Sequence, residues 1–295
     1  MSKMKNDLSI PQQGIQARAE RRANQKLADY KLMIATPCYM SQVFSPYTES
    51  LVQTIRMLES VKRDYQTLFL NGDSYIDRAK NSIVAAFLES NCTDLLMIDS
   101  DMQWSPEAVA RMISNQQEII GGFFPMKNAW NQFCGHLQPD ENGNTPDLSK
   151  AVEMFDGSCL FPAHLIPGGF LRFKRAALER FADTYPELVY QDPCADPGKP
   201  DRIYTSFFEC VVFDHLRHGE DATFCRRARE MGMELWCDPN ITFGHYGIKG
   251  FHGNFHETLL KPPEEIARLM EEREALTNAA TAVRVAFQDT EEVAA

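Results

Sequence analysis

The chain has 295 residues, with 30 Lys and Arg against 41 Asp and Glu, so its formal net charge is −11. Hydrophobic residues make up 44% and charged residues 24%, the balance of a globular protein with a substantial core. The negative charge argues against a protein that coats nucleic acid, because such binding depends on Lys and Arg neutralising phosphates, although a local basic groove stays open. No stretch approaches the roughly 20 apolar residues of a membrane span. Residues 1–29 hold no apolar signal segment, so we expect a cytoplasmic location.

The eight cysteines are scattered along the chain without a CxxC pair. A tetrahedral zinc site usually draws on closely spaced ligand pairs, so the sequence offers none. Several cysteines stand in apolar runs, as Cys210 does within 207–212. We therefore expect reduced, buried thiols.

The pattern of elements divides the chain into three parts. Residues 1–29 predict a polar helical arm, residues 30–250 one continuous domain, and residues 251–295 a loop followed by a helix that begins near Pro262. The first half of the domain alternates strands and helices. Strands are expected at 31–35 (stopped by Thr36-Pro37), 65–70, 94–98 and 118–124, and helices at 48–61, at 75–89 and from Ser105-Pro106 onward. This alternation predicts right-handed βαβ crossovers, and hence an α/β fold with a mainly parallel sheet.

The second half of the domain reads as a mixed part that completes a cleft. We expect short β segments at 151–155, 158–165, 169–173 and 204–213, and helices at 174–182 and 221–231.

Two acids follow the apolar strand 94–98 directly. Asp99 and Asp101 stand at its carboxyl end, where open α/β sheets bind ligands. Alternate residues of an extended chain point the same way, so the two carboxylates can converge. Carboxylate oxygens suit hard divalent cations, which in turn bind nucleotide phosphates. An Asp-x-Asp sequence is short, however, and also occurs in solvated turns, where Asp101 would serve only to cap the next helix.

Glu220 and Asp221 open a helix further along the chain. The helix dipole favours acids in a first turn whatever they do, but one of them can also act as a general base. His245 stands between glycines on an expected loop, where a neutral imidazole can ligate a metal; a lone His is more often structural.

Taken in order, these residues resemble GT-A-type glycosyltransferases, particularly the family-2-like and mannan-polymerase-like enzymes of bacteria and phages. The resemblance covers roughly residues 30–247. It rests on short motifs whose order and spacing make it specific: 33–37, 77–82, 99–101, 168–171, 219–221 and His245. It implies a GT-A (Rossmann-like) sheet flanked by helices.

The resemblance also implies roles for individual residues. The loop with Thr36, Pro37 and Tyr39 would hold the nucleotide base and ribose, and Arg78 would face the donor. Asp99, Ser100 and Asp101 would form the DxD motif, which grips the diphosphate through Mn²⁺ or Mg²⁺, with His245 as a third metal ligand. Gly168 and Gly169 would allow close approach beside the acceptor, and Asp221, less favoured Glu220, would be the base of an inverting displacement. A Gln-x-x-Arg-Trp segment, found in some processive members, is absent from the sequence, which speaks against a membrane polysaccharide synthase.

The implied activity is transfer of a sugar from a nucleotide-diphosphate sugar, with UDP-sugars favoured, to an acceptor hydroxyl. The acceptor stays open: a glycan, a protein, a small molecule, or a hydroxymethylated base in phage DNA. A sugar nucleotidyltransferase is the second enzyme class, although the segment 36–40 lacks the Gly-rich phosphate loop expected there. A non-catalytic sugar-nucleotide-binding protein is the third class. A metal hydrolase using His252 and His256 is weaker, because Gly253 follows where HExxH has its Glu.

Overall fold

The computed structural model describes residues 9–24, 29–192, 194, 198, 201–247, 250–257, 259, 261–272 and 275. Its α-helices are α1 (Ile10–Asn24), α2 (Ser45–Ser60), α3 (Ile76–Glu89), α4 (Pro106–Ser114), α5 (Arg175–Thr184) and α6 (Glu220–Glu230). Its strands up to the middle of the chain are β1 (Leu32–Cys38), β2 (Tyr65–Asn71), β3 (Asp94–Ile98), β4 (Met102–Gln103), β5 (Ile119–Gly121), β6 (Pro125–Met126), β7 (Ala129–Phe133) and β8 (His136–Leu137). The later strands are β9 (Val152–Glu153), β10 (Cys159–Leu165), β11 (Phe170–Lys174), β12 (Val189–Gln191), β13 (Ile203–Thr205), β14 (Val211–Phe213), β15 (Leu216–His218), β16 (Trp236–Cys237), β17 (Thr242–Tyr246) and β18 (Gly250–Asn254).

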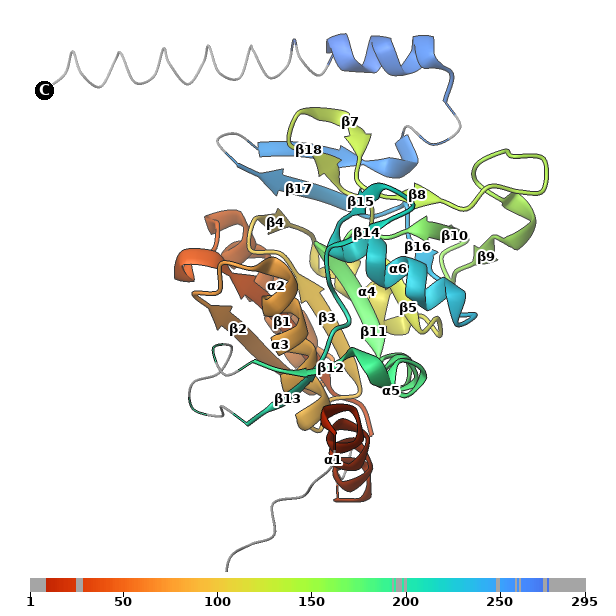
Figure 1. Ribbon diagram of the computed structural model, residues 1–295. Coiled ribbons are helices and arrows are strands. Elements are labelled where there is room, and N and C mark those ends of the chain that lie inside the picture. Colours follow the sequence, from red (N-terminus) through yellow and green to blue (C-terminus); the bar gives the residue numbers. More distant parts are fainter. Residues whose placement is uncertain are drawn as a thin grey trace, which may run out of the picture.

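One large sheet organises the described residues, in the order β2-β1-β3-β11-β5-β16-β10-β8, with β9 beside β10 (Figure 1). Strands β2, β1 and β3 are parallel, and β16 is parallel to β5. Strand β11 runs antiparallel between β3 and β5, and β10 runs antiparallel to both β16 and β8. The predicted α/β fold with a mainly parallel central sheet is confirmed.

Helices cover both faces of the sheet, and β3 shows why its sequence is continuously apolar. Leu95 and Met97 face the core under α3, α5 and α6. Leu96 and Ile98 face the opposite core under α2 and α4. A strand buried on both faces has no solvent-facing positions, so it does not alternate apolar and polar residues.

Strand β1 is longer than predicted, because it continues through Thr36-Pro37 to Cys38. Its pairing with β3 ends at Ala35, whereas its pairing with β2 continues to Cys38. Pro37 therefore lies where only one side of the strand is paired, and a residue without an N–H is tolerated at such an edge.

The predicted single strand at 204–213 is wrong. The chain forms β13, then a non-strand segment at 206–210, and then the hairpin β14–β15. Asp214 and His215 both have positive φ, as a tight hairpin turn requires.

Cys210 lies in the segment between the strands and is exposed, as is Cys194, contrary to the expected burial. Cys38, Cys92, Cys225 and Cys237 are buried, and all eight cysteines are free thiols.

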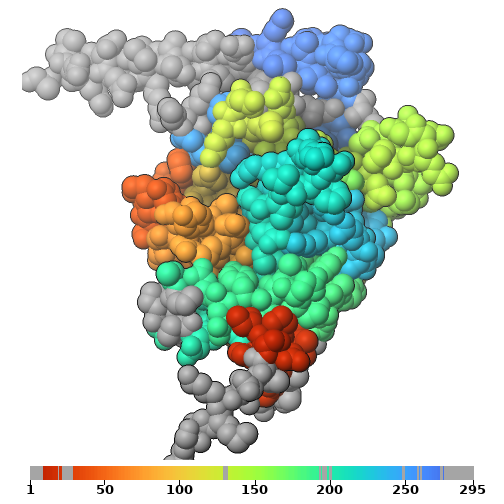
Figure 2. Space-filling model, in the orientation of Figure 1, coloured from red at the N-terminus to blue at the C-terminus, as the bar shows by residue number. Residues whose placement is uncertain are grey.

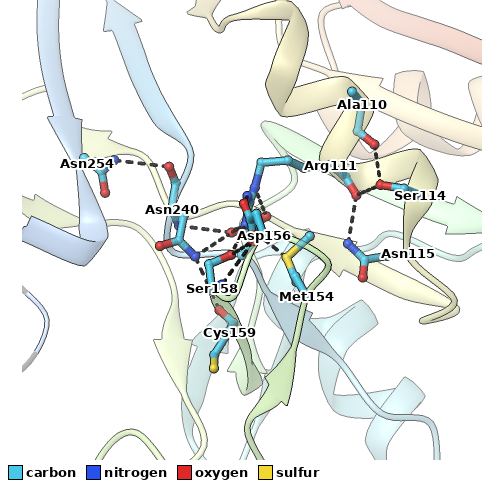
Figure 3. Close-up of polar contacts among 11 residues, drawn as sticks. Ala110, Arg111, Ser114, Asn115, Met154, Asp156, Ser158, Cys159, Asn240 and Asn254 are labelled. Carbon is cyan, nitrogen blue, oxygen red and sulfur yellow. Dashed lines mark hydrogen bonds and ion pairs between the residues drawn. The ribbon is translucent and has the colours of Figure 1, made fainter.

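A partly buried ion cluster joins α4 to the second half of the domain (Figure 3). Arg111 on α4 donates through Nε to Asp238 at 2.6 Å and through a terminal nitrogen to Ser158 at 2.8 Å, and it pairs with Asp156. Asp238 is fully buried, so Arg111 supplies the charge that makes its burial tolerable.

Both ends of the predicted domain differ in detail from the sequence boundaries. Helix α1, in the predicted arm, packs on β12 and β13, and Gly14 leaves no room for a Cβ against Val189. At the other end, β18 crosses the boundary at residue 250 and pairs with β17, so residues 251–254 belong to the domain. Residues 263–272 are helical, as predicted. Residues 276–295 lie outside the described part.

Candidate functional site

The site forms where β3 ends and β11 begins. Because β11 is antiparallel to β3, the segment Gly168-Gly169 that leads into it lies beside Asp99, and the Asp99 N–H donates to the Gly169 carbonyl at 3.0 Å. The first turn of α6 reaches the same point, since the Gly168 N–H donates to Asp221 Oδ2 at 2.8 Å. Residues separated by up to 122 positions thus meet at one edge of the sheet.

Lys80 of α3 is the centre of this cluster. Its side chain is 1% exposed, and its ammonium donates to Asp221 Oδ1 at 2.7 Å and to Glu220 Oε1 at 2.9 Å. The same ammonium lies over the Phe208 ring, 5.6 Å from its centroid. Sequence reasoning missed Lys80 as a site residue. One signal was available: Lys80, Val84 and Phe87 follow helical spacing on the buried face of α3, where an unpaired lysine would be costly.

The charged groups of the cluster shift one another's pKa values. Burial alone would lower the pKa of Lys80, but Asp221 and then Asp99 and Glu220 raise it well above its usual range. Burial alone would raise the pKa of Asp221, yet Lys80 and the Gly168 N–H hold it below its ordinary value. For Asp99, burial dominates and raises the pKa to about 7, with Asp101 adding to the rise and Lys80 opposing it. Asp221 is therefore a firmly held carboxylate, while Asp99 lacks full compensation for its charge.

The two glycines make room for this cluster. A Cβ on Gly168 would lie 2.3 Å from Lys80 Nζ and 2.5 Å from Asp221 Oδ1. A Cβ on Gly169 would lie 2.6 Å from the Phe124 ring and 3.2 Å from Asp99 Oδ2. The space that the resemblance assigned to an approaching acceptor is taken by the protein's own side chains.

Asp101 and His245 meet through the pairing of β4 with β17. The predicted loop around His245 is wrong, because His245 lies within β17, opposite Met102. Its Nε2 lies 3.7 Å from Asp101 Oδ2, and its Nδ1 lies 2.8 Å from the Pro125 carbonyl oxygen. Burial lowers the pKa of His245, which favours the neutral ring. A carbonyl accepts only from Nδ1–H, so in the neutral ring Nε2 carries the lone pair.

Lys127, which follows β6, forms an ion pair with Asp101 Oδ2. Its side chain is 39% exposed, so it is held far less tightly than Lys80. Nothing in the sequence distinguishes this lysine from a surface lysine.

Asp99 and Asp101 do not sit on an extended segment as predicted. The Met102 N–H donates to the Asp99 carbonyl at 3.2 Å, which makes residues 99–102 a turn. The two side chains remain close enough for the charge of Asp101 to raise the pKa of Asp99. Asp99 Oδ1 and Asp101 Oδ1 are each buried without a hydrogen-bond partner among the described residues.

The unpartnered oxygens of Asp99 and Asp101 and the lone pair of His245 Nε2 are the kinds of ligand atom that can bind a divalent cation. The cation site is not preassembled, however: in the part of the chain described, no three His, Cys, Asp or Glu side chains form a ready metal-binding group. Mn²⁺ or Mg²⁺ would be held by Asp99 and Asp101, with His245 as a further ligand, and it would neutralise phosphate charge.

Four further predicted site residues lie in or just after β1 and β3. Thr36 is buried and its hydroxyl bonds the Tyr47 hydroxyl, Pro37 is buried, and Tyr39 is 62% exposed at the end of β1. The Ser100 carbonyl accepts from the Phe44 N–H at 3.0 Å.

Arg78 and Lys80 both lie on α3, but they contact different residues. It donates to both oxygens of Asp73, at 2.8 and 2.9 Å, and lies 3.8 Å from Asp192. It lines a separate hollow of about 430 Å³ with Asn81 and Tyr190. The structure thus brings together Asp99, Asp101, Gly168, Gly169, Glu220, Asp221 and His245, whereas the contacts of Arg78 lie outside this group.

No protein-family model and no curated protein matches the chain. Among solved structures, the chain is similar to 4-diphosphocytidyl-2C-methyl-D-erythritol synthase from Anaerococcus prevotii, with 10% identity, 58% of this chain and 80% of that chain covered, and a TM-score of 0.31. It is also similar to HddC from Yersinia pseudotuberculosis in complex with GMP-PN, with 13% identity, 51% and 79% covered, and a TM-score of 0.27. Likenesses this weak do not assign a function. Within the described residues, no helix is both long and apolar enough to cross a membrane.

Proposed function

We propose that the protein is a cation-dependent transferase acting on a nucleotide-linked sugar, and that it transfers the sugar to an acceptor hydroxyl. The observation that carries the proposal is the pair of buried, unpartnered oxygens of Asp99 and Asp101 at the carboxyl end of β3. A buried carboxylate oxygen without a hydrogen-bond partner is costly, and at this edge of an α/β sheet a ligand would complete it.

In this reaction the acceptor oxygen forms a bond to the anomeric carbon. The bond from that carbon to the diphosphate breaks, and the nucleoside diphosphate leaves with the electron pair. A cation held by Asp99 and Asp101 would neutralise the charge on the leaving group. The acceptor proton passes to a carboxylate at the first turn of α6, where Asp221 is fixed by Lys80 and the Gly168 N–H.

Nucleotidyl transfer is the second candidate, and the Lys80–Asp221 pair favours it. A carboxylate whose pKa is held low is a weak base, which suits a reaction whose nucleophile is already ionised. A sugar phosphate attacking a nucleoside triphosphate is such a nucleophile and needs no base. Against this candidate, residues 36–41, at the end of β1 and just after it, include no glycine or basic residue for a phosphate loop.

The two reactions release different products, so one experiment separates them. The full chain is incubated with Mn²⁺ and a panel of UDP- and GDP-sugars, and in parallel with nucleoside triphosphates plus sugar 1-phosphates. We expect nucleoside diphosphate from one sugar nucleotide, with the signal lost in EDTA and in Asp101→Asn and kept in the exposed-loop control Asp140→Asn. Release of pyrophosphate instead selects nucleotidyl transfer. Turnover by Asp101→Asn at the wild-type rate overturns the assignment of the cation site.

A further inference from the structure

A second cavity lies at the opposite end of α6 from Asp221. It has a volume of about 550 Å³ and lies between the C-terminal end of α6, β10, β16 and the 138–150 segment, which projects from the body in Figure 2. Gln138, Lys150, Arg229, Glu234 and Trp236 supply its polar and aromatic lining. Arg229 follows Asp221 by eight residues on one helix, a rise of about 12 Å, so this cavity is distinct from the carboxylate cluster.

Arg229 on α6 has a buried side-chain donor, as Arg227 also has at one terminal nitrogen, but of the two only Arg229 lines the cavity. Arg226 bonds Glu230 at 2.7 Å, and Arg227 pairs with Glu209. The Nε of Arg229 is buried and meets no acceptor in the described part of the chain. Burial also lowers its pKa, although an arginine remains charged. Arg229 also lines the cavity, so an anion bound there would lie beside a charged side chain.

Charged groups of both signs lie near Arg229, with Glu230 among the negative ones. Lys150 lines the same cavity. His164 on β10 has a lowered pKa because of burial and then because of the charges of Arg229 and His136. Gln138 and Glu234 offer groups that hydrogen-bond hydroxyls, and Trp236 offers part of an indole wall.

We propose that this cavity binds a small anionic sugar, a hydroxyl-rich ring that carries one phosphate or carboxylate. Arg229 and Lys150 contact the anionic group, while Gln138 and Glu234 bond the ring hydroxyls. Glu234 disfavours a compact polyanion such as a triphosphate, because a second negative group would lie near its carboxylate. The proposal stands on the cavity alone and does not depend on the transferase activity.

The test is isothermal titration of the full chain in EDTA with glucose 6-phosphate, glucuronate, glucose and inorganic phosphate. We expect one of the two charged sugars to bind at least tenfold more tightly than glucose and than phosphate. The phosphate and carboxylate arms identify which anion the cavity takes. Equal affinity for glucose, or no binding of either charged sugar, overturns the proposal. If inorganic phosphate binds as tightly as glucose 6-phosphate, the claim that the cavity recognises a sugar ring is overturned.

Substitutions locate the binding. Arg229→Gln is expected to weaken the charged sugar at least tenfold, and Arg229→Lys to weaken it less, because it keeps the charge but not the fork. Arg226→Gln, one turn earlier on α6 and outside the cavity, is the matched control and retains the affinity. Asp101→Asn also retains it, which distinguishes this cavity from the carboxylate cluster. Unchanged binding by folded Arg229→Gln overturns the proposal.

Discussion

The ammonium of Lys80 lies 2.7 Å from a carboxylate oxygen of Asp221, although 141 residues separate them in the chain. This contact joins α3 to the first turn of α6 under the carboxyl end of the sheet. Asp221 reaches on to the Gly168 N–H, which leads into β11. One ion pair therefore holds together the elements that form the candidate site.

Replacing Lys80 with Met should destabilise the fold strongly, because it leaves Asp221 and Glu220 without their counter-charge. Removing one partner of a buried pair typically costs about 3–5 kcal/mol. Urea unfolding followed by circular dichroism measures the free energy. The control Lys127→Met breaks a partly exposed pair and should cost less than about 1 kcal/mol. Equal costs for the two variants would show that Lys80 is not compensating buried charge.

The same pair predicts how stability depends on acid. Because the folded pKa of Asp221 lies below its unfolded value, its contribution is complete above about pH 4 and is lost as pH falls through the folded pKa. Asp221→Asn removes this contribution. The stability of the wild type should therefore fall more steeply than that of the variant between about pH 4 and pH 2. Parallel pH curves in urea titrations would contradict the assigned direction.

The sequence predicted a strand of the sheet well where the strand's own residues show that it is buried. Asp99 and Asp101 directly follow the apolar run of β3, so the order of residues in the chain is enough to place them at a sheet edge. The extension of β1 through Pro37 depends instead on where β3 stops pairing, which is a property of the neighbouring strand. The break between β13 and β14 depends on Asn81, which bonds the backbone of Phe208 on both sides at 2.8 and 2.9 Å.

The acids of the cluster stand out in the sequence, as does His245, whereas its two lysines do not. Carboxylates at a strand end and a helix start are visible as local patterns. Lys80 and Lys127 gain their partners only when distant segments meet, 141 residues away for Asp221 and 26 residues away for Asp101. For Gly168, the sequence indicated close approach, but only the fold shows that Lys80 and Asp221 are the groups that approach.

Lys127 should compete with a divalent cation for Asp101. It pairs with the oxygen that lies beside His245 Nε2, and a cation would replace that ammonium. Removing one positive charge near the ligands is worth about 1–4 kcal/mol at a distance near 4 Å. Lys127→Met is thus expected to tighten Mn²⁺ binding about tenfold, measured as free Mn²⁺ by electron paramagnetic resonance. As the control, Asp101→Asn should weaken Mn²⁺ binding. An unchanged Mn²⁺ affinity in Lys127→Met would show that the ammonium and the cation do not compete for Asp101.

Gly168→Ala tests whether the cluster must be packed as closely as it is. The added Cβ would lie 2.3 Å from Lys80 Nζ and 2.5 Å from Asp221 Oδ1, and both atoms are fixed by their mutual bond. We expect a loss of about 1–3 kcal/mol of stability, the usual cost of overpacking. Gly219→Ala is the matched control, because nothing lies within 4 Å of its Cβ and it precedes the same acids. As the residue before α6, it should cost less than about 1 kcal/mol. Thermal unfolding compares the two, and a Gly168→Ala protein as stable as Gly219→Ala would mean that Lys80 can leave Asp221 at little cost.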